Sequence, residues 1–201
     1  MKVYIVLIAA LFSANAFASK ARVNSLQGAN HLIDTQTVFT VPSHLLLLNP
    51  YLTFEFGSPG TDAEGGIMRN VGNGKLLLYG GHQNTTDTEI YSDQRVTNSY
   101  IEQRNPVEAI YAIGKMGFGA SISHAEDKTA GNKETSMVLK WGMNMMNEGW
   151  AYAHLHAWNH AEKRNTGVSD TQNTMPYLTL GAANAYGNLR VFAEGSFGKT
   201  T

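Results

Sequence analysis

The sequence predicts an all-β protein: an antiparallel up-and-down transmembrane β-barrel of about 8–10 strands, truncated or incompletely closed. Three observations predict this fold class. The chain begins with an export signal, its strand candidates alternate between apolar and polar residues, and the connections between those strands alternate between short and long. Each observation is weak alone, and together they favour a membrane barrel over a soluble sandwich.

The N-terminal residues MKVYIVLIAALFSANAFASK begin with one cation, Lys2, which is followed by an apolar run and by small residues before Ser19. This order is typical of a Sec signal peptide that is cleaved before Ser19. A transmembrane helix is the alternative, but the apolar run is too short to cross about 30 Å of hydrocarbon. We therefore expect a signal peptide at 1–18, a periplasmic segment preceding the barrel at 19–49, and barrel strands within 50–201.

The stretch SMVLKWGMNMMNEGWAYAHLHAW, residues 136–158, shows the alternation most clearly. A helix would mix apolar and polar residues around its circumference, and Gly142 and Gly149 would each weaken it by about 1 kcal/mol. We interpret the stretch as a hairpin with an apolar, lipid-facing side and a polar side toward a lumen. The apolar side takes Met137, Leu139, Trp141, Met143, Met145, Ala151, Ala153, Leu155 and Ala157, and the lumen side takes Lys140, Trp150, Tyr152, His154, His156 and Trp158.

The same alternation predicts further strands along the chain, at 50–57, 64–71, 75–82, 107–115, 118–126, 134–145, 150–159, 176–186 and 188–198. Short connections fall at one end of these strands and longer ones at the other, the longest being 83–106 and 160–175. Outer-membrane barrels combine tight periplasmic turns with longer external loops, whereas the Greek-key connections of a sandwich are not sorted in this way.

Composition narrows the function classes. The chain has no cysteine, so disulfide scaffolds, thiol catalysis and zinc–thiolate sites are excluded. Removing Lys2 with the signal leaves 14 cations from 15, against 16 anions, and this net charge of −2 gives no basic surface for nucleic acid.

By strand parity, seven ionisable side chains point into the expected lumen: Glu55, Glu108, Lys140, His154, His156, Arg190 and Glu194. Their mixed signs favour either a wet, weakly selective interior or an ion-paired plug over a strong charge filter. We predict no catalytic residue, metal ligand or cofactor. His154 and His156 share a face, but a polar lumen wall is favoured over a metal site, and His156 with His160 lacks the glutamate of a zincin pair.

The arrangement ARVNSLQGANHLIDTQTVFTVPSHL, followed by YLTFEFG and AEGGIMRNVG, resembles the N-terminal part of the major outer-membrane proteins of Bdellovibrio-type bacteria. It is more distantly similar to the long-chain fatty-acid transporter family. The likeness covers about the first third of the chain and implies a porin-like barrel. Two departures stand out: Gln27 replaces a glycine of the pattern, and FTVPSH at Phe39–His44 replaces an Asn-Pro-Ala motif, so the resemblance lends no support to a plug role for this segment.

We therefore expect a porin-like or structural barrel of the Gram-negative outer membrane that allows passive passage of small solutes. The alternative is an outer-membrane transporter or binder of an apolar ligand. A lipid hydrolase is a third hypothesis that would need a Ser–His pair facing lipid, and we expect no enzyme. The expected partners are outer-membrane lipid and the barrel-assembly machinery, with a homo-oligomer left open and no nucleic acid.

The strand count also predicts that the chain is incomplete. An odd number of strands starting from the periplasm leaves the C-terminal end outside the cell, whereas single-chain bacterial barrels have even strand numbers. The end GSFGKTT also lacks the closing strand with a terminal aromatic residue. We expect a curved open sheet or a strained small barrel, with 188–198 as an edge strand.

Overall fold

The computed structural model describes residues 33–55, 63–82, 106–127, 132–146, 148–165, 168–174, 176–186 and 189–197. The expected signal peptide at 1–18, residues 19–32 of the expected pre-barrel segment and residues 83–105 of the long connection lie outside these residues.

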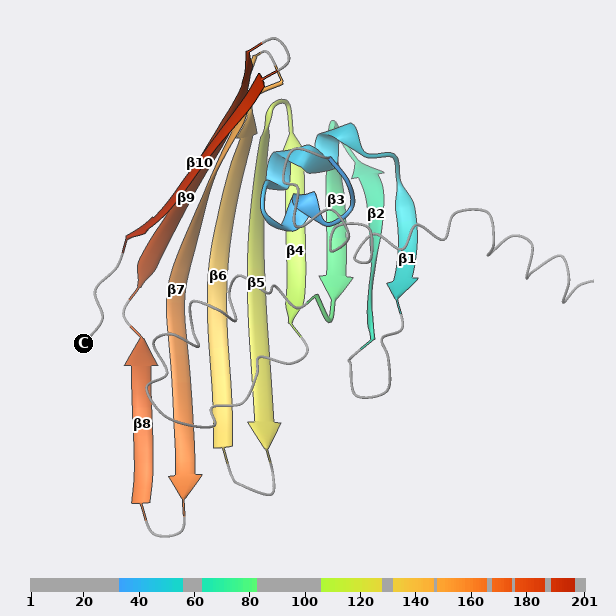
Figure 1. Ribbon diagram of the computed structural model, residues 1–201. Coiled ribbons are helices and arrows are strands. Elements are labelled where there is room, and N and C mark those ends of the chain that lie inside the picture. Colours follow the sequence, from blue (N-terminus) through green and yellow to red (C-terminus); the bar gives the residue numbers. More distant parts are fainter. Residues whose placement is uncertain are drawn as a thin grey trace, which may run out of the picture.

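The described residues form one antiparallel sheet (Figure 1) in which each strand pairs with the next along the chain, except at β8. Its strands are β1 (Tyr51–Glu55), β2 (Glu64–Val71), β3 (Gly74–Gly80), β4 (Val107–Ile113), β5 (Met116–Asp127), β6 (Asn132–Asn144), β7 (Trp150–Asn165), β8 (Val168–Thr174), β9 (Tyr177–Tyr186) and β10 (Leu189–Phe197). One half of β7 pairs with β9 and the other half with β8.

The sheet is open. In the described part of the chain β1 pairs only with β2, and β10 pairs only with β9. The prediction of an all-β, up-and-down, incompletely closed sheet is confirmed, and β10 is the edge strand expected at 188–198. The architecture is consistent with an incomplete β-barrel.

Strand β8 is where the prediction was wrong. Residues 160–175 were expected to be a long external connection, but β7 continues to Asn165 and the chain returns at once as β8. The sequence Val168–Thr174, VSDTQNT, has no apolar alternation, so the pattern that reveals a half-buried strand is absent here.

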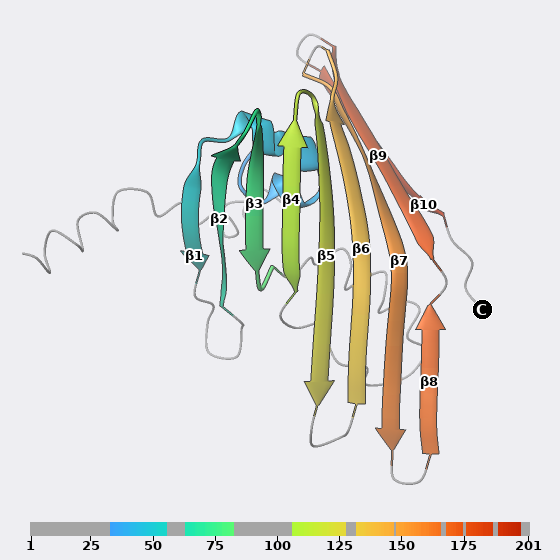
Figure 2. The ribbon, with the colours of Figure 1, turned by 180° about the vertical axis from the view of Figure 1, so that it is seen from behind.

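The two ends of the sheet differ, but not wholly as the connection lengths predicted, because β7 and β8 are joined by a short connection at the end where long ones were expected. At one end the turns are short, and Gly72 and Gly114 supply the left-handed backbone (φ 57° and 63°) that two of them need. At the other end β5, β6, β7 and β8 run well past the ends of β1–β4 (Figures 1 and 2).

One face of the sheet, the outer face, is apolar in register across the sheet. Because side chains alternate between faces, cross-strand partners on this face form continuous rows. One row is Leu52, Ile67, Leu78, Ala109, Ala120, Leu139, Leu155, Leu178 and Phe197. A second row on the short-turn side is Arg69, Leu76, Tyr111, Phe118, Trp141, Ala153, Leu180 and Gly195.

Many side chains of the outer face are exposed, including Leu52 (60%) of the first row and, in the row next to it, Phe54 (64%) and Val107 (68%). Arg69 is the single charged residue in the two rows. The apolar surface ends abruptly on the protruding strands, where the outer face carries a polar row of His124, Thr135 and His160 and then Glu126, Lys133 and Glu162.

A β-bulge corrects the assignment of Trp158. Met137 pairs with Trp158 while Val138 pairs with His156, so Ala157 is the extra residue. Beyond the bulge the faces exchange, and Trp158, expected on the lumen side, lies on the outer face with 48% of its surface exposed. The same bulge places His156 and His160 on opposite faces.

The opposite, inner face is covered by residues 34–48, which we call the inner segment. It contains two 3₁₀ helices, η1 (Thr37–Phe39) and η2 (Pro42–Leu47), drawn in blue in Figure 1. The Asp34 carboxylate accepts hydrogen bonds from the backbone N–H groups of Gln36 and Thr37, at 2.8 and 3.1 Å. Pro42 begins η2. Proline is tolerated there because the first N–H groups of a helix have no partner within the helix.

Apolar packing holds the inner segment on the sheet. Phe39 and Leu45 are almost wholly buried, in a cluster with Val38 and with side chains of β2, β3 and β4: Met68, Leu77, Tyr79, Ile110 and Ala112. Burying each large apolar side chain contributes about 1.5–3 kcal/mol. The stretch FTVPSH, for which the resemblance supports no plug role, lies at the centre of the segment that covers the inner face.

Two glycines allow the close approach of η2. Gly117 of β5 and Gly142 of β6 are cross-strand partners directly beneath Pro42 and Ser43. A Cβ atom on Gly117 would lie 2.3 Å from the Pro42 carbonyl carbon, and one on Gly142 would lie 2.9 Å from the Pro42 ring. The side chain of Asn144 adds two hydrogen bonds with Ser43, at 2.9 and 3.0 Å.

We expect Gly142→Ala to lift the inner segment from the sheet, because overpacking of this kind costs about 1–3 kcal/mol. Limited proteolysis should then cut the chain near the normally buried Phe39. Gly80→Ala is the matched control, since a Cβ atom there meets nothing within 4 Å. Equal protection of Phe39 in both variants would contradict the proposed contact.

Candidate functional site: the inner face beneath the helical segment

The register places all seven sequence-predicted residues on the inner face, although they differ in burial. Lys140 and His154 lie in one inner row, and Glu108 and His156 lie in the next. These four are buried, Glu55 is half-buried, and Arg190 and Glu194 are exposed. Whether this face lines a lumen stays a prediction.

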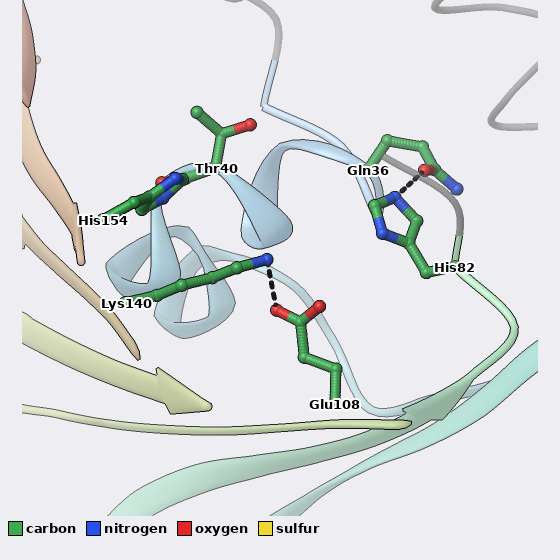
Figure 3. A network of polar contacts seen from close by, with 6 residues as sticks. All are labelled: Gln36, Thr40, His82, Glu108, Lys140 and His154. Atoms are coloured by element: carbon green, nitrogen blue, oxygen red, sulfur yellow. Dashed lines mark hydrogen bonds and ion pairs between the residues drawn. The ribbon is translucent and has the colours of Figure 1, made fainter. Parts of the chain in front are cut away.

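Lys140 and Glu108 form a buried ion pair at the centre of the site. The Lys140 ammonium group donates to a Glu108 carboxylate oxygen at 2.8 Å, and both side chains are only 2% exposed. The pair bridges β6 and β4 across β5, where Gly119 is the cross-strand partner of Lys140 and has no side chain to block it. Figure 3 shows the two side chains pointing toward each other beneath the inner segment.

The inner segment contacts this pair and its neighbour on β7. The Lys140 ammonium group lies 6.0 Å from the centroid of the Phe39 ring, within the range of a cation–π contact. His154, the cross-strand partner of Lys140, donates from Nε2 to the carbonyl oxygen of Thr40 at 2.7 Å. His154 therefore links β7 to the inner segment (Figure 3).

The remaining predicted residues serve other contacts. His156 stacks on the Tyr177 ring with centroids 3.9 Å apart. Arg190 forms an exposed ion pair with Glu148 in the turn before β7, at 2.6 Å, and Glu194 accepts a hydrogen bond from the Tyr152 hydroxyl group. Arg190 and Glu194 thus reach β7 and its preceding turn rather than each other.

Sequence reasoning missed the residues of the inner segment and several of their partners. Gln36 and His82 are joined by a hydrogen bond of 3.1 Å, and the His82 ring stacks on Phe39 at 3.7 Å. The Lys75 ammonium group donates to the carbonyl oxygen of Leu46 at the end of η2, at 2.9 Å. The one signal in the sequence was that Gly142 and Asn144 fall on the inward side of their strand, where a glycine would allow another segment to approach closely.

We also searched the described residues for a metal site, a membrane-spanning helix and a catalytic pair. No group of three or more His, Asp or Glu side chains there could hold a metal ion. Within the same residues, no helix is long and apolar enough to span a membrane. On the outer face, His124 Nδ1 lies 2.9 Å from the Thr135 hydroxyl oxygen, but a hydroxyl–imidazole pair needs a third group to orient the base before it resembles a catalytic triad.

Comparison with protein-family models, curated proteins and solved structures found no match to the chain. The candidate site is therefore judged on its own geometry. That geometry is a buried polar layer sealed by a helical segment, in which Lys140, Glu108 and His154 each have a partner.

The ion pair determines the effect that we expect of Lys140→Gln. A position in a polar lumen, which is all that strand parity indicates, would tolerate glutamine, but here the substitution would leave the Glu108 carboxylate buried without the Lys140 cation. Breaking a buried pair in this way costs about 3–5 kcal/mol. We expect Lys140→Gln to lower the urea midpoint of unfolding in detergent, and the double variant with Glu108→Gln to recover most of the loss. Equal midpoints for the single variant and the unmodified chain would contradict this assignment.

Proposed function

We propose that the chain is a porin-like outer-membrane β-barrel protein that allows passive passage of small solutes and whose bore is narrowed by its own inner segment. Export by a Sec signal peptide and insertion by the barrel-assembly machinery are parts of this proposal. The proposal rests above all on the continuous apolar rows of the outer face.

The dimensions of the outer face support a lipid contact. From Met137 to Met145 the outward positions of β6 and its turn are Met137, Leu139, Trp141, Met143 and Met145. This stretch is about 27 Å long at 3.4 Å per residue, and a tilt of about 40° reduces its height to about 20 Å, comparable with the apolar band of outer-membrane barrels. Water would not favour so large an exposed apolar surface.

The inner face supports a restricted passage. Ionisable groups gather there, while Phe39, Leu45 and Val41 of the inner segment are buried against the sheet near its short-turn end. A solute that passes along this face must go around the segment or displace it. Because Lys140 and Glu108 neutralise each other, the passage would have weak charge selectivity.

An outer-membrane carrier of an apolar ligand is the second candidate. One observation favours it: on β2–β4 the inner face has an apolar cluster, Met68, Leu77 and Ile110, under the inner segment. An apolar ligand could replace Phe39 and Leu45 on this surface. Small polar solutes would make no favourable contact with these apolar side chains.

Planar-bilayer recordings test the conduit. We expect small conductance steps from the purified protein and larger steps from Gly142→Ala, because the displaced segment no longer narrows the bore. A heat-modifiable gel shift should accompany both. No conductance from either form, together with a normal gel shift, would reject the conduit and favour the carrier of an apolar ligand.

Replacing Leu139 by Arg tests the lipid contact. A cation in the middle of the apolar band costs about 2–4 kcal/mol, so Leu139→Arg should reduce the folded fraction recovered in the outer membrane. His124→Arg is the matched control, because His124 is also exposed on the outer face but lies beyond the apolar rows. Equal yields of the two variants would show that this face does not meet lipid.

A further inference from the structure

Two histidines, His44 and His154, make hydrogen bonds that hold the inner segment in place. The surroundings of each ring suit a neutral imidazole and not a charged one. His44 is fully buried within η2, and its Nδ1 lies 3.2 Å from the Thr37 hydroxyl oxygen. That hydroxyl group donates to the Asp34 carbonyl oxygen at 3.0 Å, so it must accept from His44 Nδ1–H. The proton of neutral His44 is therefore on Nδ1.

The second nitrogen of His44 has no place for a proton. Nε2 is buried and has no hydrogen-bond partner among the described residues. A proton added there would create a buried cation with an unpaired N–H group, which is costly in a low-dielectric interior. Trp150 lies edge-on to the ring, with centroids 5.7 Å apart, and offers no acceptor atom.

His154 is constrained in a related way from the sheet. Its Nε2–H group already donates to the Thr40 carbonyl oxygen, so a further proton would go to Nδ1 and make an imidazolium. The cross-strand partner of that imidazolium is Lys140, and two cations would then share one inner row.

The described groups around the two histidines offer no free carboxylate that would offset the positive charge of an added proton. η1 follows Asp34, whose carboxylate caps two N–H groups, and β4 offers Glu108, which is engaged by Lys140. β5 presents Gly117, and β9 presents Thr179, neither of them charged. Further groups on the inner face are Lys75 of β3, Lys140 and Glu134 of β6, His156 of β7, Glu64 of β2, and Glu194 of β10, which accepts a hydrogen bond from Tyr152.

We propose that the inner segment is an acid-released latch, seated while His44 and His154 are neutral and freed from the inner face when they take up protons. This inference goes beyond passive passage, because it makes the covering of the inner face depend on pH. It needs only the described contacts, so it can fail while the conduit stands.

Burial supports the direction of the effect. Desolvation lowers the pKa of His44 from 6.5 to about 4. A released segment would take up the proton near 6.5, so the seated state is fully favoured above that value and loses stability as the pH falls toward 4. At about pH 5 this one group weakens seating by about thirtyfold.

Thiol labelling tests the latch, because the chain has no cysteine of its own. Val41→Cys places a reporter at a position that is 2% exposed in the seated segment, and Leu47→Cys places a reference at a position that is 57% exposed in the same segment. The reference corrects for the pH dependence of the labelling reaction. The expected result is a ratio of Val41→Cys to Leu47→Cys labelling that rises at least tenfold from about pH 7.5 to about pH 5.

Histidine variants assign the effect. In the Val41→Cys background, His44→Gln together with His154→Gln should remove most of the rise, since glutamine does not titrate and its amide can still donate to Thr40. His124→Gln, on the outer face, should leave the rise intact. A constant ratio across this pH range, or an equal rise in the double histidine variant, would overturn the latch. The gel shift checks that each variant is folded.

Discussion

The close contact between η2 and the glycine pair of β5 and β6 is the constraint on which the packing of the inner segment against the inner face depends. Because Gly117 and Gly142 have no side chain, the backbone at Pro42 and Ser43 lies directly on the sheet. That height brings the Thr40 carbonyl group within reach of His154 and places Phe39 near Lys140. With larger residues on both strands, the helical turns would stand farther off and these contacts would be lost.

The contact also explains how charged groups are tolerated under the segment. Lys140 and Glu108 are removed from water, and their mutual attraction must offset a desolvation cost of several kcal/mol per ion. Their geometry is good, at 2.8 Å, and Gly119 leaves the path between them clear. A pair of this kind adds little net stability, but it penalises any alternative placement of the segment that separates the two charges.

Much of the sheet could be predicted from sequence because side-chain alternation has a period of two. On β6 the apolar parity from Met137 to Met143 is correct, and on β7 it is correct up to His156. The bulge at Ala157 could not be seen, since one extra residue changes the face without changing composition. Strand β8 was missed because its sequence, VSDTQNT, does not alternate between apolar and polar residues. The inner segment was missed because short 3₁₀ helices have no long periodic pattern.

The inner segment covers an inner face that has an apolar part and a polar part, and it places apolar side chains on the first and polar groups on the second. On β2–β4 that face presents Met68, Leu77 and Ile110, and Phe39 with Leu45 packs there. Toward β6 and β7 it presents Asn144 and His154, which bond Ser43 and the Thr40 carbonyl group. Rotating the segment in place would set polar groups against apolar side chains and leave Asn144 and His154 without these partners, so the two halves of the inner face together specify a single orientation. In the proposed latch, a proton at His154 would weaken the contacts of the polar half, while the apolar cluster beneath Phe39 carries no titrating group.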